Sequence, residues 1–353
     1  MTQRNRKMTA PNAKAHVEIN NGFYRAFEER FRGPRAAIKK RLEVYLPFVK
    51  PLLDHHRAAK VLDLGCGRGE WLELMRETGF EVEGVDLDAG MLEACIQLDL
   101  PVIQGDAINH LKKMAEDSHA VISAFHVVEH ITYEELYELI AESLRVLTPG
   151  GLLILETPNP ENLVVATSSF YLDPTHERPI PPDLLAFIPE SKGFKRSKIL
   201  RLQEAKDLLH NPAPDLLAVL KGVSPDYSVI AQKTAPQKML AVFDEMFKRD
   251  YGLSLDALAG RFEERLHQAE EKAGQAEEKA GQAEEKAGQA ENMARQAIEA
   301  TQRAVTQAQI AEQALQDIFN SHSWRVTKPL RLTGQAARWF KRGTIAWLTF
   351  APQ

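Results

Sequence analysis

The sequence predicts an α/β fold with a parallel sheet, followed by a long coiled coil and a basic amphipathic tail. Short apolar segments alternate with helical ones from residue 60 to 157, the pattern of a parallel sheet covered by helices. A glycine-rich turn joins the first strand to the first helix. From residue 255 onward, small and apolar residues recur at alternating steps of three and four, which is typical of heptads. With 353 residues, 44% of them hydrophobic, the chain has room for one domain of ordinary size and an extended part.

Changes in composition divide the chain into five parts. We expect a helical lid segment at 1–58, the α/β domain at 59–235, a connecting helix at 236–254, the coiled coil at 255–320 and the tail at 321–353. Aromatic residues from Phe23 to Phe31 and apolar residues from Ile38 to Leu46 predict two helices, interrupted at Gly33-Pro34. These helices either pack against the α/β domain, with their arginines in solvent, or form a lid over a ligand pocket of that domain.

The strands and helices of the α/β domain follow in regular order. The first strand starts at Lys60, and later strands are expected at 81–86, 101–106, 119–127, 152–157, 194–202 and 227–231. A capping box at Thr132 and Glu135 opens a helix that ends before Pro149. A proline-rich loop follows the fifth strand. Irregular loops beyond the C-terminal ends of such strands are where these sheets bind substrates.

The segment 61–72, VLDLGCGRGEWL, predicts a nucleotide-type pocket. Its three glycines allow positive φ and let the main chain approach a ligand that a Cβ would push away. The dinucleotide motif G-x-G-x-x-G requires a glycine at the position of Glu70, so a pyrophosphate ligand is disfavoured and a nicotinamide dehydrogenase is the minor alternative. G-x-G-x-G preceded by Asp63 instead resembles motif I of the class I S-adenosylmethionine (SAM) methyltransferases, which have a Rossmann-like fold.

Acidic residues at the ends of the next two strands fit the adenosine half of SAM. Asp86 ends the second strand, 23 residues after Asp63, where a carboxylate can bind both ribose hydroxyls. In methyltransferases that this chain resembles, the position of Asp106 holds the adenine amino group. Capping of a turn or helix is the alternative role of both aspartates. The expected SAM contacts are Asp63, Gly65, Cys66, Gly67, Gly69, Asp86, Leu87, Asp106, Ala107, Ala124 and Phe125.

Four side chains beyond the fourth and fifth strands are candidates for chemistry: His126, Glu129, His130 and His176. If residues 126–130 form a helical turn, the first three share one face. Methyl transfer from SAM is an in-line displacement that needs an aligned acceptor hydroxyl and a base. A histidine of near-neutral pKa suits that role. We expect all four side chains at the pocket mouth, with His130 or His176 as the base.

Glu129-His130 and Thr175-His176 are similar to segments of the ubiquinone-biosynthesis O-methyltransferases and of the small-RNA 2′-O-methyltransferases. In the latter family, two glutamates and two histidines bind Mg²⁺, and His126 stands here in place of one glutamate. Because hard cations favour oxygen ligands, this departure weakens the case for Mg²⁺, and we favour a metal-free histidine base. A metal held by Glu129, His130 and His176, or purely structural roles, are the alternatives.

The heptad segment predicts a parallel homo-oligomer, either a dimer or a trimer. Three copies of QAEEKAG occupy 268–288, and the heptad register extends from Leu255 to Ile318. With Ala273 at position a, Lys272 at g and Glu277 at the next e form the pairing that parallel partners use. A single solvated helix is the alternative. The alanine seam buries little area, so association is expected to depend on the larger residues at its ends.

The tail predicts attachment to a surface. Residues 322–353 contain six Lys or Arg and no Asp or Glu, and tryptophans lie between them. This composition suits the headgroup region of an anionic leaflet; a protein partner ranks second, and nucleic acid is not expected.

Bulk features predict a protein of the reducing cytoplasm. No apolar window approaches the roughly 20 residues that a membrane span needs, and we expect no signal peptide. Cys66 and Cys95 give no disulfide framework. We therefore expect a cytoplasmic protein, peripheral on the cytoplasmic face of the inner membrane.

A narrower resemblance concerns the acceptor. FYRAFEERFRG near the start, the DPTHERPIPPDLL loop, the coiled coil and the SWRVTKPLR tail together resemble the methyltransferase part of bacterial O-antigen chain terminators. The resemblance implies O-methylation of the terminal sugar, or of a phosphate on it, of a lipid-linked lipopolysaccharide O-polysaccharide. It implies that the coiled coil is a spacer that sets polymer length, and that the tail contacts the membrane or a glycosyltransferase. Tyr24, Arg32 and Arg178, which lie in these segments, are the expected substrate contacts.

Two other functions compete with this one. A small-molecule or quinone-type O-methyltransferase would not need the coiled coil at 255–320. A non-catalytic scaffold with the same fold would not bind SAM, and the intact glycine turn argues against it.

Overall fold

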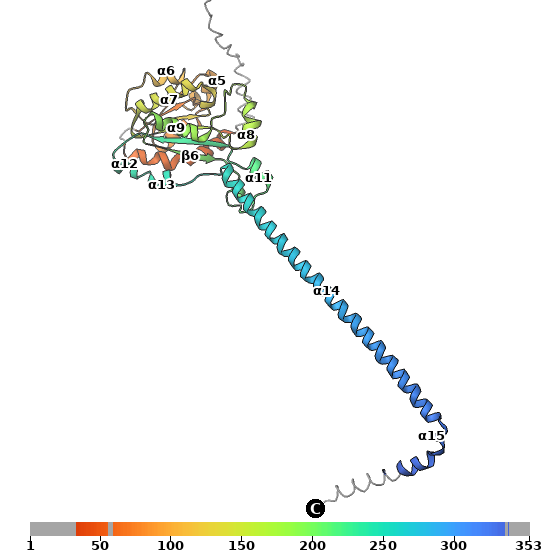
Figure 1. Ribbon diagram of the computed structural model, residues 1–353. Coiled ribbons are helices and arrows are strands. Elements are labelled where there is room, and N and C mark those ends of the chain that lie inside the picture. Colours follow the sequence, from red (N-terminus) through yellow and green to blue (C-terminus); the bar gives the residue numbers. More distant parts are fainter. Residues whose placement is uncertain (1–32, 56–58, 336–337, 339–353) are drawn as a thin grey trace, which may run out of the picture. The chain divides into compact units, whose positions relative to one another are not determined.

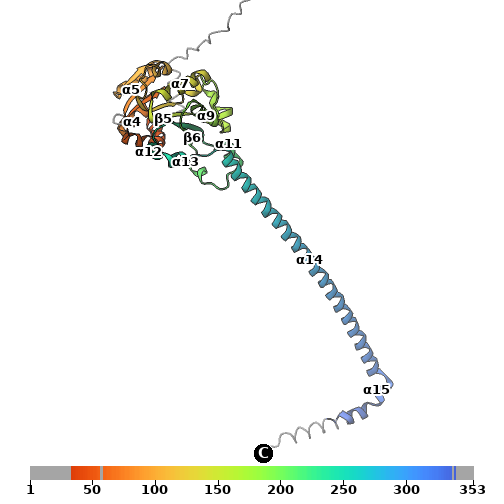
Figure 2. The same cartoon turned by 60° about the vertical axis from the view of Figure 1, so that its left-hand side comes forward.

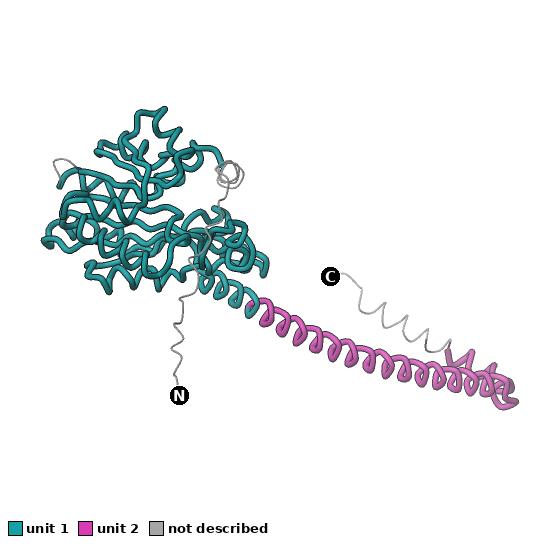
Figure 3. The backbone as a smooth tube through the Cα atoms, turned by 90° about the horizontal axis from the view of Figure 1, so that it is seen from above, with its two compact units in different colours: residues 1–267 teal, residues 268–353 magenta. Residues whose placement is uncertain are grey.

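The computed structural model describes residues 33–55, 59–335 and 338. The chain divides into two compact units, residues 1–267 and 268–353 (Figure 3). The first expected helix, from Phe23 to Phe31, lies outside the described residues, as do Tyr24 and Arg32.

The first unit is built on seven strands: β1 (Lys60–Leu64), β2 (Glu81–Asp86), β3 (Val102–Gln104), β4 (His119–Phe125), β5 (Leu147–Pro158), β6 (Arg196–Leu202) and β7 (Asp226–Gln232). They form one sheet in the order β3-β2-β1-β4-β5-β7-β6. The pairs among β1 to β5 are parallel, whereas β7 lies antiparallel between β5 and β6. The predicted Rossmann-like α/β fold is confirmed, and the reversed β7 is the departure from a parallel sheet.

Helices cover both faces of the sheet because its strands carry apolar side chains on both. Val61 and Leu62 of β1 belong to two different buried clusters, and so do Leu152 and Leu153 of β5. One cluster includes α6 (Ala107–Leu111), α7 (Tyr133–Val146) and α9 (Pro182–Lys192); the other includes α4 (Glu70–Thr78) and the segment before β1. Figures 1 and 2 show α7 and α9 on one side, and α12 (Gln237–Ala241) and α13 (Asp244–Lys248) on the other.

The segment at 236–254 was expected to be one connecting helix, and this prediction is wrong. It forms the two short helices α12 and α13, which meet at Phe243. Phe243 is fully buried in the same cluster as Leu200 and Ile230 of the sheet. Because this side chain anchors the chain to the sheet, the segment folds onto the domain instead of extending from it.

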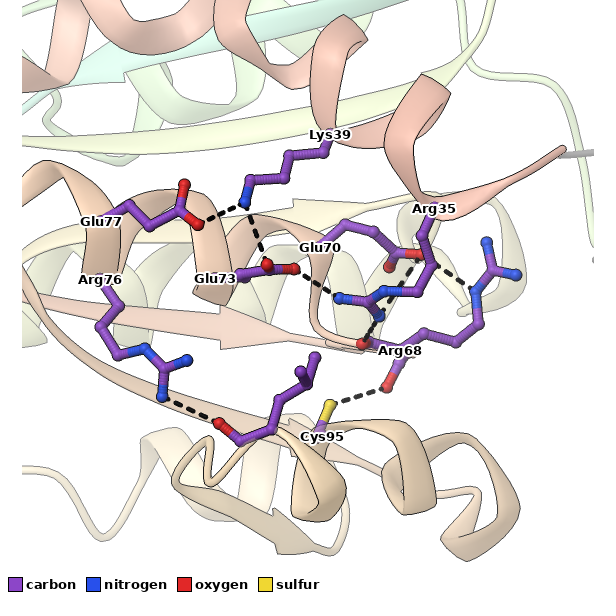
Figure 4. Close-up of polar contacts among 10 residues, drawn as sticks. Arg35, Lys39, Arg68, Glu70, Glu73, Arg76, Glu77 and Cys95 are labelled. Carbon is purple, nitrogen blue, oxygen red and sulfur yellow. Dashed lines mark hydrogen bonds and ion pairs between the residues drawn. The ribbon is translucent and has the colours of Figure 1, made fainter.

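The segment before β1 is a packed flank. It consists of α2 (Arg35–Leu42), η1 (Glu43–Tyr45), α3 (Leu46–Val49) and η2 (Lys50–Asp54), and α2 begins directly after Gly33-Pro34, as predicted. Tyr45 and Phe48 are buried against the sheet. Ion pairs fix α2 to α4: Arg35 Nη2 lies 2.7 Å from Glu73 Oε2, and Lys39 Nζ lies 2.7 Å from Glu77 Oε1 (Figure 4).

The predicted coiled-coil segment forms one helix, α14 (Leu255–Asn320). Its first turns pack on the domain: Leu258 is fully buried, and Leu255, Ala259 and Phe262 pack against the same apolar cluster. Arg261 Nη1 donates to the carbonyl oxygens of Leu208 and Asn211, at 3.2 and 3.3 Å. Three positions assigned to the oligomer seam, Leu255, Ala259 and Phe262, therefore pack on the first unit.

Beyond this junction, every residue of α14 from 263 to 320 is exposed. The tail continues as α15 (His322–Val326), and the guanidinium carbon of Arg331, beyond this helix, lies 3.4 Å from the centroid of the Trp324 ring. Trp339 and Trp347 lie outside the described residues. None of the described helices is both long enough and apolar enough to cross a bilayer.

Candidate active site

The glycine-rich turn between β1 and α4 needs its glycines for two different reasons. Gly65, Gly67 and Gly69 all have positive φ, from 53° to 78°. A Cβ on Gly65 would lie 2.5 Å from Val127 Cγ2, and one on Gly69 would lie 2.7 Å from Cys95 Sγ. A Cβ on Gly67 would be in ordinary contact with Met91 Cε at 3.6 Å, so this glycine is required by its positive φ and not by crowding. The first and last glycines are required by both the backbone conformation and close packing, and the middle one by the backbone conformation alone.

A cavity of about 250 Å³ lies beside this turn. The turn itself forms one wall, α2 contributes Ile38, Arg41 and Leu42, and the sheet contributes side chains from the C-terminal ends of its parallel strands. The segment before β1 is thus both a packed flank and a wall of the cavity.

Asp63 is the buried acid of this cavity. Its side chain accepts a hydrogen bond from the Ser123 hydroxyl at 2.7 Å, and the residue is 2% exposed. Burial raises the pKa of the Asp63 carboxyl to about 8; the Ser123 hydrogen bond opposes this, and the nearby charges of Asp86 and Glu70 add to it. A cationic ligand beside this buried carboxyl would lower its pKa, because a positive charge stabilises the ionised form. The ionised carboxyl would in turn attract the ligand.

Asp86 and Asp106 lie at the strand ends where the sequence places them. Asp86 Oδ2 accepts from the Gly67 N–H at 2.8 Å, and its Oδ1 accepts from the Asp88 N–H at 2.9 Å. Asp106 caps α6 by accepting from the Asn109 N–H at 2.8 Å. Both aspartates therefore perform the capping role that was the alternative, and these contacts leave their ligand-binding roles as predictions.

The eleven expected SAM contacts divide into two groups in the structure. Five line the cavity: Asp63, Gly65, Cys66, Gly67 and Phe125. Six do not: Gly69, Asp86, Leu87, Asp106, Ala107 and Ala124. Leu87 is 69% exposed, whereas Ala124 is fully buried in the core, so the Ala124 side chain does not face a ligand.

His130 and His176 form a pair whose tautomers follow from their partners. The Thr175 hydroxyl donates to Asp173 Oδ1 at 2.7 Å, so it accepts from His130 Nδ1–H at 2.9 Å. His176 Nδ1–H donates to the Phe170 carbonyl oxygen at 2.5 Å. Both neutral imidazoles therefore carry their lone pair on Nε2. The two rings contact each other with centroids 4.7 Å apart.

Glu129 is fully buried near both His126 and His130. Its Oε2 accepts from the Thr157 hydroxyl at 3.0 Å, and its Oε1 lies 3.1 Å from His126 Nδ1. Burial alone would raise its pKa, but the hydrogen bond to His126 and the charges of His126 and His130 lower the pKa of Glu129 to about 2. Glu129 is therefore an ionised carboxylate that links His126 to His130.

The four candidate side chains do not converge on one point, which corrects the predicted shared face. His126 has φ of 55°, and only residues Val128–His130 form the short helix η3. Glu129, His130 and His176 make one potential ligand group, and His126 joins Glu156 and Asp226 in another. His126 lines the cavity, whereas the other three do not.

Neither candidate metal group offers Mg²⁺ the oxygen shell that it prefers. Glu129, His130 and His176 would provide two imidazole nitrogens and one carboxylate. The expectation that Mg²⁺ is not favoured stays a prediction.

Several residues at the cavity were missed by sequence reasoning. Glu156 ends the apolar run LLIL, and its position at the C-terminal end of a strand could have identified it. Asp226 and Gln203 have no such signal, because their positions depend on the reversal of β7. Trp71 lines the cavity, and its buried indole Nε1–H has no partner among the described residues.

Of the three predicted substrate contacts, only Arg178 is described. Its guanidinium carbon lies 5.7 Å from the centroid of the Tyr133 ring. The preceding residue, Glu177, donates its N–H to the Glu129 carbonyl oxygen at 2.8 Å, which fixes this loop beside the histidine pair.

Comparisons with known proteins identify the family of the domain. The family model described as "Methyltransferase domain" matches residues 35–195. The crystal structure of a SAM dependent methyltransferase from Archaeoglobus fulgidus is 34% identical, with a TM-score of 0.53, and the match covers 60% of this chain and 100% of that one. A ubiquinone biosynthesis O-methyltransferase of Proteus mirabilis is 25% identical over 206 residues, 54% of this chain and 80% of the relative. A ubiquinone biosynthesis O-methyltransferase of Burkholderia multivorans is 26% identical over 199 residues, which are 51% of this chain and 81% of the relative. The chain belongs to the SAM-dependent methyltransferases.

Proposed function

We propose that this enzyme transfers the methyl group of SAM to an acceptor hydroxyl, with His130 or His176 as the base. The observation that carries the proposal is the pair of imidazoles whose Nδ1–H groups are engaged by Thr175 and the Phe170 carbonyl. A base with its lone pair fixed on Nε2 can take the hydroxyl proton as the oxygen attacks.

The residues of the cavity fit SAM. The main chain of the glycine turn lines the cavity at Gly65 and Gly67, and the buried Asp63 favours a cationic ligand such as a sulfonium. Bound SAM supplies an electrophilic methyl group. Transfer would join the acceptor oxygen to the methyl carbon as the carbon–sulfur bond breaks, and His130 or His176 would accept the proton of a hydroxyl acceptor at Nε2. A hydroxyl acceptor would give a methyl ether and an ionised phosphate acceptor a methyl phosphate ester, each with S-adenosylhomocysteine.

For the acceptor, we propose the terminal sugar, or a phosphate on it, at the non-reducing end of an O-antigen polysaccharide. Methylation of this position ends chain growth. The resemblance of the loop at 173–185, of α14 and of the tail to the O-antigen chain terminators supports this choice. The 66 residues of α14 would act as the spacer that sets polymer length.

In this proposal the chain is a parallel dimer or trimer held by the α14 seam, located at the cytoplasmic face of the inner membrane. The stacking of Arg331 on Trp324 supports a basic, aromatic surface in the tail. That surface contacts either the leaflet or a glycosyltransferase.

A second candidate acceptor is a quinone-type phenol. It is favoured by the two curated relatives, which are ubiquinone biosynthesis O-methyltransferases. A phenol acceptor would also use an imidazole base, so the geometry of His130 and His176 does not separate the two acceptors.

The experiment that decides between them uses the full chain with methyl-labelled SAM. The acceptors are defined O-polysaccharide oligosaccharides, with and without a terminal phosphate, and polyprenylated catechols. We expect label on the oligosaccharides. Label on the catechols alone would remove the polysaccharide proposal in favour of the second candidate, and SAM binding without transfer to any hydroxyl would contradict O-methylation.

A further inference from the structure

A second group of possible metal ligands lies in the cavity itself. His126 follows β4, Glu156 lies in β5 and Asp226 begins β7. One nitrogen or oxygen atom from each lies within 4.8 Å of the other two, and His126 Nε2 is 3.6 Å from Glu156 Oε1. These three strands are neighbours in the sheet, and the His126 N–H donates to the Glu156 carbonyl oxygen at 2.9 Å. The group therefore lies at the ends of three neighbouring strands, β4, β5 and β7.

Each of the three side chains is oriented by a polar partner behind it. Glu129 Oε1 lies 3.1 Å from His126 Nδ1, the Tyr45 hydroxyl donates to Glu156 Oε2, and Gln203 Nε2 donates to Asp226 Oδ2 at 2.7 Å. In proteins, metal-binding histidines usually donate their second ring nitrogen to a carboxylate or carbonyl, and metal-binding carboxylates are hydrogen-bonded in turn. The group shows this arrangement at all three positions.

The charges of the site leave an excess of negative charge. Glu129, Glu156 and Asp226 lie around the His126 imidazole. Among the described residues, two cations line the same cavity: Arg41 from α2, and Arg68, which is paired with Glu70 at 3.0 Å. A divalent cation would balance the two carboxylates of the group.

The other group, Glu129, His130 and His176, is less suited to a metal. Both carboxylate oxygens of Glu129 already have partners, Thr157 and His126, and the residue is fully buried. Neither it nor the two histidines line the cavity. An ion can reach His126, Glu156 and Asp226 through the cavity without breaking those contacts.

We propose that His126, Glu156 and Asp226 bind one divalent transition-metal cation, such as Mn²⁺ or Zn²⁺, beside the SAM cavity. Two carboxylate oxygens and one imidazole nitrogen suit these borderline ions better than Mg²⁺. Three protein ligands leave open positions for water or for an oxygen atom of the acceptor. This last role rests on the proposed O-methyl transfer, whereas the binding of the ion does not.

The test uses the full chain after treatment with a chelator, with Mn²⁺ as the probe. Binding is measured by calorimetry and by the electron paramagnetic resonance of free Mn²⁺. We expect one site per chain. Asp226→Asn and Glu156→Gln should each weaken it by about tenfold or more, and Tyr45→Phe should weaken it by about tenfold through the loss of an orienting bond. His176→Gln is the matched control and should keep the wild-type affinity.

A second measurement detects the nitrogen ligand of bound Mn²⁺. It distinguishes the proposed site from a site made only of carboxylates elsewhere on the chain. The echo-modulation spectrum of bound Mn²⁺ should show coupling to an imidazole nitrogen, and this coupling should be absent in His126→Gln. Binding of S-adenosylhomocysteine by each variant checks that the domain is folded.

Two results would overturn the proposal: no stoichiometric Mn²⁺ site in the wild-type chain, or a site lost in His176→Gln and kept in Asp226→Asn. Methyl transfer in the presence of the chelator is measured separately. Transfer without a metal site refutes only the metal, whereas a metal site without transfer to any hydroxyl refutes only the proposed O-methylation.

Discussion

The α/β domain and the distal part of α14 differ in what stabilises them. The domain buries apolar side chains on both faces of its sheet, and residues such as Leu62 and Leu153 are fully buried. Every residue of α14 from 263 to 320 is exposed, and its repeats contain glycines that each cost about 1 kcal/mol in a helix. Most helices in proteins are stabilised by packing of an apolar face. The comparison teaches that burial of apolar side chains stabilises the domain, whereas the side chains of the distal helix are exposed in the single chain.

The junction at residues 255–262 belongs to the domain. Leu258 is buried with Val219, Val223 and Leu253, so the first turns of α14 are part of a folded core. Chemistry and assembly should therefore be separable by changes on either side of this junction.

The largest expected effect breaks the chemistry and leaves assembly intact. His130→Gln should lower kcat by about 10²- to 10⁴-fold, because the variant lacks the proton-accepting Nε2. The affinity for SAM, measured by calorimetry, should stay the same. The mass of the assembly, measured by sedimentation, should also stay the same. If kcat is unchanged in both His130→Gln and His176→Gln, neither imidazole is the base.

The converse change breaks assembly and leaves chemistry intact. A chain of residues 1–267 retains the packed first turns and should be monomeric, while it still methylates short acceptors at the wild-type rate. Sedimentation and labelled transfer measure the two properties. An oligomer of this truncated chain would place the interface in the domain.

One substitution at two places in α14 sharpens the comparison further. Leu258→Ala removes a fully buried side chain and should lower the free energy of unfolding of the domain by about 2–5 kcal/mol. Leu315→Ala changes a side chain that is 53% exposed and should alter this free energy by less than about 0.5 kcal/mol, while it weakens association. Urea denaturation and sedimentation are the measurements. Equal losses of domain stability would contradict the division at residue 262.

The smallest expected effect is a pH dependence that belongs to the domain alone. The pKa of Asp63 rises on folding from 3.8 to about 8, so the folded state binds the extra proton between these values, and its stabilising contribution is lost as pH rises through that range. Asp63→Asn should therefore gain stability relative to the wild type with rising pH in urea denaturation. The chain of residues 1–267 should show the same trend, and a flat difference would mean that Asp63 is ionised throughout.

Much of the active site could be predicted because its residues follow from local rules. Glycines next to a strand end predicted the turn, and Gly65, Gly67 and Gly69 all have the positive φ that the prediction required. His130 and His176 were expected near each other, and their rings are in contact. The shared helical face of residues 126–130 was wrong, because His126 has a positive φ and precedes the short helix, although its ring still contacts Glu129 and lies near Glu156.

The sequence by itself determined the alternation of strands and helices, the glycine turn and the helical repeat of α14, because periodicity and backbone sterics act over a few residues. Only the tertiary structure decided that β7 runs antiparallel, that Phe243 ties the segment after it to the sheet, and that Asp226 meets His126 and Glu156. These contacts join residues far apart in the chain. Their free energy comes from burial and charge shared across neighbouring strands, which no local pattern specifies.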